Sequence, residues 1–142
     1  MEQFDTKEGY KILNNMISVI KENKAYLSEI DGAIGDGDHG INMSKGFTMT
    51  EERLEGETPD LFKALNTLGR TLLMEIGGSM GPLYGQIFKG MAKEVKEKEQ
   101  IDADTFASML EAAYDAVKKL GNAKVGDKTL VDTLDPAVAA FK

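Results

Sequence analysis

The sequence predicts an all-α protein, an antiparallel up-and-down bundle or barrel of amphipathic helices. Two observations support this fold class. Apolar residues recur at three- and four-residue steps along most of the 142-residue chain, which is the spacing of one helix face. No segment alternates convincingly between apolar and polar residues, as a half-buried strand would. The length suits one domain with its own core, so we expect residues 1–142 to form a single domain.

The first two predicted helices precede and follow a glycine-rich segment. The first spans about residues 6–23 and has a continuous apolar face. That face comprises Tyr10, Leu13, Met16, Ile17 and Ile20. The second spans about residues 38–54, with a weaker apolar stripe.

The third predicted helix has the clearest pattern. Thr58 is a suitable N-cap, Pro59 suits the first helical position, and Gly77-Gly78 ends the helix. Its apolar stripe comprises Leu61, Leu65, Leu68, Leu72 and Ile76.

Three further helices complete the prediction. A fourth spans about residues 81–98. A fifth lies between Asp102, a suitable N-cap, and Gly121, a suitable C-terminal glycine. The last segment, about residues 129–141, has a helical pattern that Pro136 interrupts.

Composition excludes several classes of function. The chain has no cysteine and one histidine, which excludes a disulfide scaffold, a thiolate zinc site and a cysteine nucleophile. A formal net charge of −7 argues against nucleic-acid binding, which depends on basic groups that neutralise phosphates. No apolar run is long enough to span a membrane. The acidic N-terminus lacks the apolar stretch of a signal peptide, so we expect a cytoplasmic protein.

The segment most typical of a functional site is residues 31–42, which reads Asp-Gly-Ala-Ile-Gly-Asp-Gly-Asp-His-Gly-Ile-Asn. Its glycines allow tight turns that could bring Asp31, Asp36 and Asp38 together. Three converging carboxylates need a cation between them, and oxygen ligands favour Mg²⁺ or Ca²⁺. The alternative is a solvated acidic turn without a ligand.

Familiar motifs fit this chain poorly. Residues 35–40 spell G-x-G-x-x-G, but a helix precedes them where a dinucleotide fold requires a strand. An EF-hand read from Asp36 would need glycine and glutamate where Ile41 and Phe47 stand. Residues 121–129 approach a P-loop, but an aspartate interrupts the motif before its lysine and an amphipathic helix precedes it.

A second glycine cluster, residues 77–85, joins the third and fourth predicted helices. A glycine-rich entry into a helix exposes N–H groups and the positive end of the helix dipole, which favours anions; a tight packing turn is the alternative. In an up-and-down bundle, residues 31–42, 77–85 and 121–129 should meet at one rim. Carboxylates beside anion-binding amides predict a Mg²⁺–nucleotide or Mg²⁺–phosphate site there.

Three motifs occur in order along the chain. They are Ile-Gly-Asp-Gly-Asp-His-Gly-Ile-Asn-Met at 34–43, Gly-Gly-Ser-Met-Gly-Pro-Leu-Tyr-Gly at 77–85, and Gly-Asp-Lys-Thr at 126–129. Together they resemble the family of nucleotide-binding subunits of bacterial dihydroxyacetone kinases, the DhaL family. The resemblance covers the whole chain and implies a helical barrel with ADP or ATP at one rim.

The resemblance also implies the site residues. Two Mg²⁺ ions would be held by Asp31, Asp36 and Asp38 and would bridge to the phosphates of ADP. Nucleotide contacts would come from His39, Gly40, Ile41, Asn42, Ser79, Met80, Gly121 and Leu130. No residue of this chain would act as a covalent catalyst. In the phosphoenolpyruvate-dependent systems, a phosphohistidine of a DhaM-type subunit converts the bound ADP to ATP, and a DhaK-type subunit holds the dihydroxyacetone that receives the phosphoryl group.

The family domain normally continues with further helices and an arginine-bearing loop, so we expect this chain to lack the C-terminal helices of that domain. The sequence leaves a homodimer open. Alternative functions are the nucleotide domain of an ATP-dependent dihydroxyacetone kinase or of a fatty-acid kinase, or a regulatory docking subunit without turnover. His39 disfavours the fatty-acid kinases, which typically carry threonine at this position.

Overall fold

Helices make up most of the described chain, which confirms the all-α prediction. The computed structural model describes residues 3–33, 37–77, 80–121 and 136–140. Its elements are β1 (Gln3–Asp5), the 3₁₀ turn η1 (Thr6–Glu8), α1 (Gly9–Glu22), α2 (Lys24–Gly32), α3 (His39–Arg53), α4 (Leu61–Glu75), α5 (Met80–Val95), β2 (Gln100–Asp102) and α6 (Ala103–Gly121). Residues 136–140 are also helical. In these ranges, no helix has the length and apolar character needed to cross a membrane.

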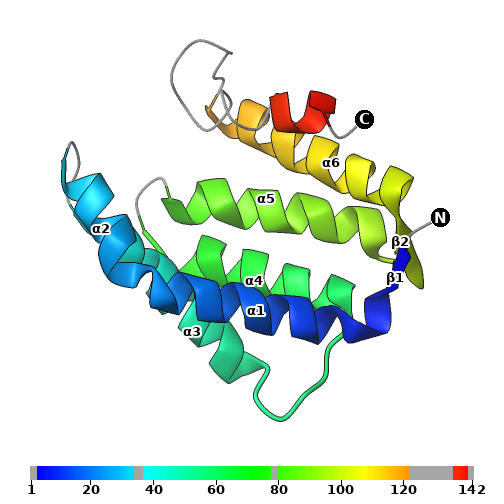
Figure 1. The fold of residues 1–142 in the computed structure, drawn as a ribbon, viewed down its shortest axis with the longest axis horizontal. Helices are drawn as coiled ribbons and strands as arrows, with labels where there is room; N and C mark the ends of the chain where they lie inside the picture. The colour runs from blue at the N-terminus through cyan, green and yellow to red at the C-terminus, as the bar shows by residue number, and fades with distance from the viewer. Residues whose placement is uncertain (1–2, 34–36, 78–79, 122–135, 141–142) are drawn as a thin grey trace.

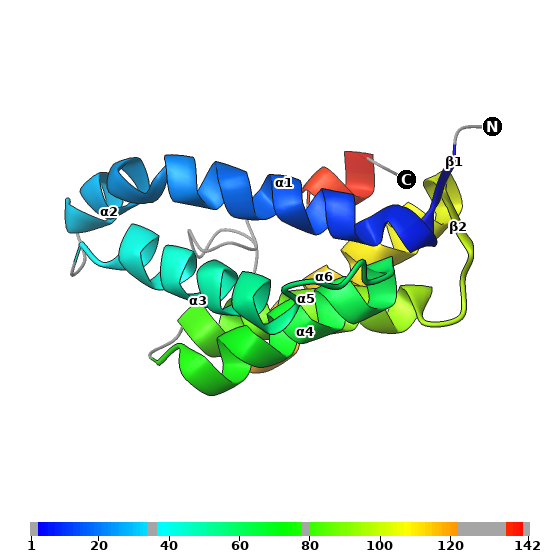
Figure 2. The same ribbon diagram turned by 90° about the horizontal axis from the view of Figure 1, so that it is seen from below.

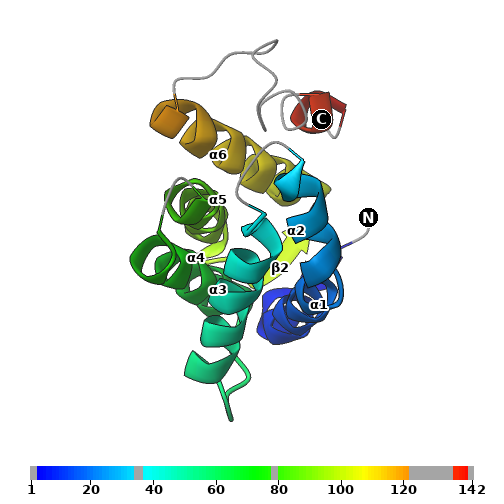
Figure 3. The ribbon, with the colours of Figure 1, turned by 90° about the vertical axis from the view of Figure 1, so that its left-hand side faces the viewer.

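The long helices form a curved row in which successive helices run in opposite directions (Figures 1 and 2). Viewed along the helices, the row passes from α1 through α3, α4 and α5 to α6 (Figure 3). Each of these helices packs against the next one in the row, and α2 packs on α3. The arrangement matches the predicted up-and-down order, with α2 as an extension of α1.

The core lies on the inner side of this row. The predicted stripe of α4 is buried from Leu61 to Leu72, and Ile76 just beyond the helix is buried as well. Leu13 and Ile17 of α1 are buried in the same cluster as Phe47 of α3. Helical periodicity therefore identified the buried faces of α1 and α4 correctly. It was wrong for Ile41, an apolar position of the helix predicted at residues 38–54, which is 51% exposed.

Helices α4 and α5 approach each other closely, and glycines make this possible. A Cβ atom at Gly85 would lie 2.6 Å from Leu73 Cγ and 2.9 Å from the carbonyl oxygen of Gly69. A Cβ at Gly69 would in turn lie 2.9 Å from the carbonyl oxygen of Gly85. Any larger residue would force these helices apart, so the two glycines fix the position of α5 on α4.

The sequence missed one helix and misplaced one N-cap. The first predicted helix is confirmed as η1 followed by α1, but residues 24–32 form a separate helix, α2, that the sequence did not predict. The N-cap of α4 is Asp60, not Thr58, because the Asp60 carboxylate accepts a hydrogen bond from the Lys63 N–H at 2.8 Å. Pro59 therefore precedes the helix, and its carbonyl accepts from the Tyr10 N–H of α1.

A small antiparallel sheet, which the sequence did not predict, joins two short segments of the chain. β1 pairs with β2, and Phe4 lies opposite Ile101. Each strand has only three residues, too few for the alternation that marks a strand in sequence. The predicted cap of α6 is confirmed, since the Thr105 N–H donates to the Asp102 carboxylate at 2.8 Å. That hydrogen bond lowers the pKa of Asp102.

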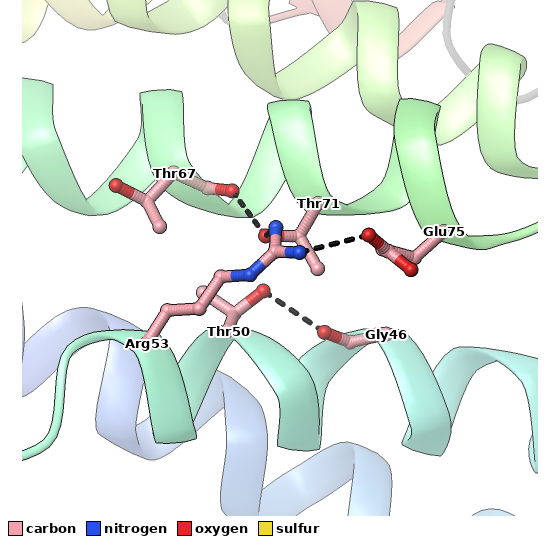
Figure 4. A network of polar contacts seen from close by, with 6 residues as sticks. All are labelled: Gly46, Thr50, Arg53, Thr67, Thr71 and Glu75. Carbon is pink, nitrogen blue, oxygen red and sulfur yellow. Dashed lines mark hydrogen bonds and ion pairs between the residues drawn. The ribbon is translucent and has the colours of Figure 1, made fainter.

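A polar network holds α3 against α4 beside the apolar core (Figure 4). The Arg53 guanidinium of α3 donates to Thr71 Oγ1 at 2.8 Å and to Glu75 at 2.9 Å, both on α4. The Thr71 hydroxyl donates in turn to the Thr67 carbonyl. Because the Arg53–Glu75 pair is partly exposed, its net contribution to stability is at most about 1 kcal/mol. The network therefore fixes how the helices align more than how stable they are.

We predict that the buried leucines of α4 dominate the stability of the fold. Leu68 is 0% exposed, whereas Met74 on the same helix is 70% exposed. Leu68→Ala should lower the free energy of unfolding by about 2–5 kcal/mol because it leaves a cavity in the core. Met74→Ala, the matched control, should change it by no more than about 0.5 kcal/mol. Urea denaturation of both variants measures the difference, and equal losses would contradict this packing.

Candidate functional site

Three helix junctions lie at the same end of the molecule. The end of α2, the start of α5 and the end of α6 all lie on the left in Figure 1 and face the viewer in Figure 3. The alternating helix directions produce this arrangement. The described helix ends beside the three predicted loops therefore lie at one rim, as the sequence predicted. Residues 34–36, 78–79 and 122–135 lie outside the described chain.

The junction between α2 and α3 joins two of the predicted metal ligands. Asp31 Oδ2 accepts hydrogen bonds from the N–H groups of Asp38 at 3.0 Å and His39 at 3.2 Å. A carboxylate at a helix N-terminus satisfies N–H groups that have no partner within the helix, and it interacts favourably with the helix dipole. Asp31 therefore caps α3 from the preceding helix, and this bond holds the backbone of Asp38 close to the Asp31 side chain.

The Asp31 carboxylate keeps coordinating capacity after this capping. Both hydrogen bonds go to Oδ2, and within the described residues no bond to Oδ1 occurs. Asp31 and Asp38 are each only partly buried, so a hydrated cation could approach them. Carboxylate oxygens at such a place fit a hard cation such as Mg²⁺, which keeps several water ligands when bound to protein.

Gly40 has a structural role that the sequence did not reveal. A Cβ atom there would lie 1.8 Å from the Lys24 carbonyl oxygen and 2.8 Å from Ser28 Oγ, both on α2. Only glycine allows α2 to pack this closely on the first turn of α3. Gly37 adopts a φ of 75° in the segment between the helices, which is a backbone conformation that favours glycine. These two glycines bring the ends of α2 and α3 together.

The remaining predicted contacts on α3 lie in its first turn. Ile41 is 51% exposed, while His39 and Asn42 are half-buried and Gly40 is buried beneath α2. A ligand at this rim could therefore reach the side chains of His39, Ile41 and Asn42, but only the backbone of Gly40.

Tyr84 of α5 is a site neighbour that the sequence reasoning missed. Its ring lies beside the His39 imidazole, with ring centroids 6.0 Å apart and planes tilted by 54°. Burial raises the pKa of the Tyr84 hydroxyl. The second glycine cluster contains Tyr84, but nothing in the sequence indicated that this side chain would meet His39. The contact connects the α2–α3 junction to α5.

The other predicted site residues are only partly described. Met80 begins α5 and Gly121 ends α6, so both are at the same end as Asp31 and Asp38. Asp36, Ser79 and Leu130 lie outside the described residues. Within the described ranges, no group of three or more His, Cys, Asp or Glu residues could hold a metal. The three-carboxylate centre, which requires Asp36, stays a prediction.

Comparison with known proteins gives the family. Residues 33–142 match the family described as the DAK2 domain. The chain belongs to the DAK2 domain family. The match begins two residues after Asp31, so it includes α3 to α6 but not the residue that caps α3.

Several relatives of this chain are named as ADP-binding DhaL subunits of dihydroxyacetone kinases. It is 39% identical over 139 residues to "PEP-dependent dihydroxyacetone kinase 1, ADP-binding subunit DhaL" of Listeria innocua, covering 97% of this chain and 70% of the relative. It is 45% identical over 117 residues to the PTS-dependent DhaL subunit of Lactococcus lactis, covering 80% and 57%. With the DhaL subunit of Escherichia coli it shares 33% over 125 residues, covering 87% and 60%. The matched segment thus spans 57% to 70% of these relatives' lengths.

We predict that Asp31 stabilises this DAK2 domain even without metal. Asp31→Ala removes the acceptor for two N–H groups of α3 and should lower the free energy of unfolding by about 1 kcal/mol. Urea denaturation in EDTA measures this loss. Glu29→Ala is the matched control, because Glu29 is an exposed acid on the same helix. A loss no larger than that of the control would contradict the capping role.

Proposed function

We propose that this chain binds ADP with Mg²⁺ at the α2–α3 end and serves as the ADP-binding subunit of a phosphoenolpyruvate-dependent dihydroxyacetone kinase. The observation that carries the proposal is the bonding of Asp31 to the backbone of Asp38 and His39. These bonds place the Asp31 carboxylate at the N-terminus of α3, beside the backbone of Asp38. A carboxylate next to a helix N-terminus is a combination that suits a Mg²⁺–diphosphate group. The names of the relatives supply the nucleotide and the substrate.

Charge balance supports two Mg²⁺ ions. Asp31, Asp36 and Asp38 together with a diphosphate carry roughly six negative charges, and two divalent cations offset about four of them. The described pair, Asp31 and Asp38, would hold metal, with Asp36 as the third carboxylate. Further nucleotide contacts would come from His39, Gly40 (through its backbone), Ile41, Asn42, Ser79, Met80, Gly121 and Leu130.

The role of this chain in the reaction is to hold and orient the nucleotide and its metal ions. When bound, the nucleotide carries a phosphoryl group from a phosphohistidine of a DhaM-type partner to dihydroxyacetone on a DhaK-type partner. The carboxylates of this chain would hold the metal ions, and the positive end of the α3 dipole would favour the negative charge of the phosphates. Phosphoryl transfer depends mainly on positioning and charge neutralisation, so no side chain here acts as a covalent nucleophile. We assign this activity to the cytoplasm, where the partner subunits would operate.

Thermal unfolding tests the proposal directly. We expect the melting temperature to rise with Mg²⁺ and ADP together, and far less with either alone or with ADP plus EDTA. Ligand at about a hundred times its dissociation constant adds about 2.7 kcal/mol to the free energy of unfolding, because it binds only the folded state. No rise with both ligands present would contradict Mg²⁺–ADP binding by this chain.

We predict that Asp38→Asn separates metal binding from folding. The amide keeps the size of the side chain, and the backbone N–H of residue 38 can still donate to Asp31. Stability without ligand should change little, whereas the rise with Mg²⁺ and ADP should be lost because a carboxylate ligand is gone. Asp104→Asn, an exposed change at the start of α6, should keep the full rise. A full rise in the Asp38→Asn variant would refute the metal assignment.

A further inference from the structure

Two ring contacts connect α3 and α5 along one line. Deep in the core, Phe47 of α3 meets Phe88 of α5 edge-on, with centroids 6.2 Å apart and an interplanar angle of 82°. Toward the rim, His39 meets Tyr84 at 6.0 Å. His39 and Phe47 lie two turns apart on α3, and Tyr84 and Phe88 lie one turn apart on α5. The two ring pairs therefore extend from the core at Phe47 to His39, the first residue of α3.

We propose that Tyr84 is a positioning residue for the nucleotide, because its ring fixes the orientation of the His39 imidazole at the rim. The inference rests on the proposed function, in which His39 contacts ADP. It adds a residue from another helix, α5, to the proposed site.

The support behind Tyr84 makes it a rigid platform. Its neighbour Gly85 lies directly against α4, where a Cβ would come within 2.6 Å of Leu73 Cγ. Tyr84 and Phe88 both pack against the core cluster that contains Phe47. Tyr84 therefore occupies a place that the packing of α5 on α4 determines.

His39 is then held at two points by two different elements. Its backbone N–H donates to Asp31 on α2 at 3.2 Å, and its ring meets Tyr84 on α5. An imidazole held in place before the ligand arrives loses less conformational entropy on binding. Immobilising one such side chain costs about 0.5–1.5 kcal/mol, which corresponds to about a two- to tenfold change in dissociation constant.

The test uses the fact that His39 is the sole histidine of the chain. Its imidazole gives one set of NMR signals, which can be recorded at one fixed pH. In the wild-type chain, a nuclear Overhauser effect should connect the His39 and Tyr84 ring protons. Tyr84→Leu should shift the imidazole signals and weaken Mg²⁺–ADP binding about two- to tenfold by calorimetry. Tyr84→Phe keeps the ring and should restore both.

Phe88→Leu is the matched control. It removes a ring one turn away that meets Phe47 rather than His39, so it should lower the melting temperature without changing the His39 signals or the ADP affinity. This comparison separates positioning from a general loss of packing.

Each contrary outcome has a distinct meaning. Absence of the Overhauser effect in the wild type overturns the inference without any variant. It is also overturned if Tyr84→Leu binds Mg²⁺–ADP as tightly as the wild type, or if Tyr84→Phe fails to restore binding; the proposed function survives both results. If the wild-type chain binds no Mg²⁺–ADP, the proposed function and the role of Tyr84 fall together.

Discussion

The close packing of α4 against α5 is the constraint on which the rest of this structure depends. Gly69 and Gly85 let the two backbones approach within a distance that no Cβ atom would tolerate. Gly46 leaves room for side chains of α4 against α3, since a Cβ there would lie 2.4 Å from Leu72 Cδ2. With α3 and α5 both fixed on α4, their first turns lie at one end of the molecule, and Tyr84 can reach His39.

Hydrogen bonds and a helix dipole stabilise the Asp31 carboxylate at the junction between α2 and α3. Carboxylates near one another repel, but Asp31 is stabilised by two N–H groups and by the positive end of the α3 dipole. The bonded carboxylate therefore has hydrogen-bond partners without metal, and its Oδ1 has no bond among the described residues. Gly40 brings α2 close enough for this bond to form. In this way, packing between helices prepares a charge arrangement suited to a divalent cation.

Sequence periodicity predicted the features that depend on local spacing, such as the leucine stripe of α4 and the Asp102 cap of α6. It failed where neighbouring residues compete: Thr58 and Asp60 are both good caps, and only the three-dimensional path shows that Asp60 reaches Lys63. The density of carboxylates among glycines made residues 31–42 the candidate site in the sequence, and their metal binding stays a prediction. The capping role of Asp31 and the contact of Tyr84 with His39 could not be recognised from the sequence, because both depend on how separate helices pack.

The central claim, that a divalent cation and ADP bind beside Asp31 and Asp38, can be tested by paramagnetic relaxation. Mn²⁺ would replace Mg²⁺ in the presence of ADP, and the signals of His39 would be followed by NMR, since this histidine is unique in the chain. The account predicts strong broadening of the His39 signals, weaker broadening at Tyr84, and sharp signals for Ile101 in β2 at the opposite end. Sharp His39 signals under conditions where Mn²⁺–ADP is bound would contradict the account, because the cation would then lie elsewhere.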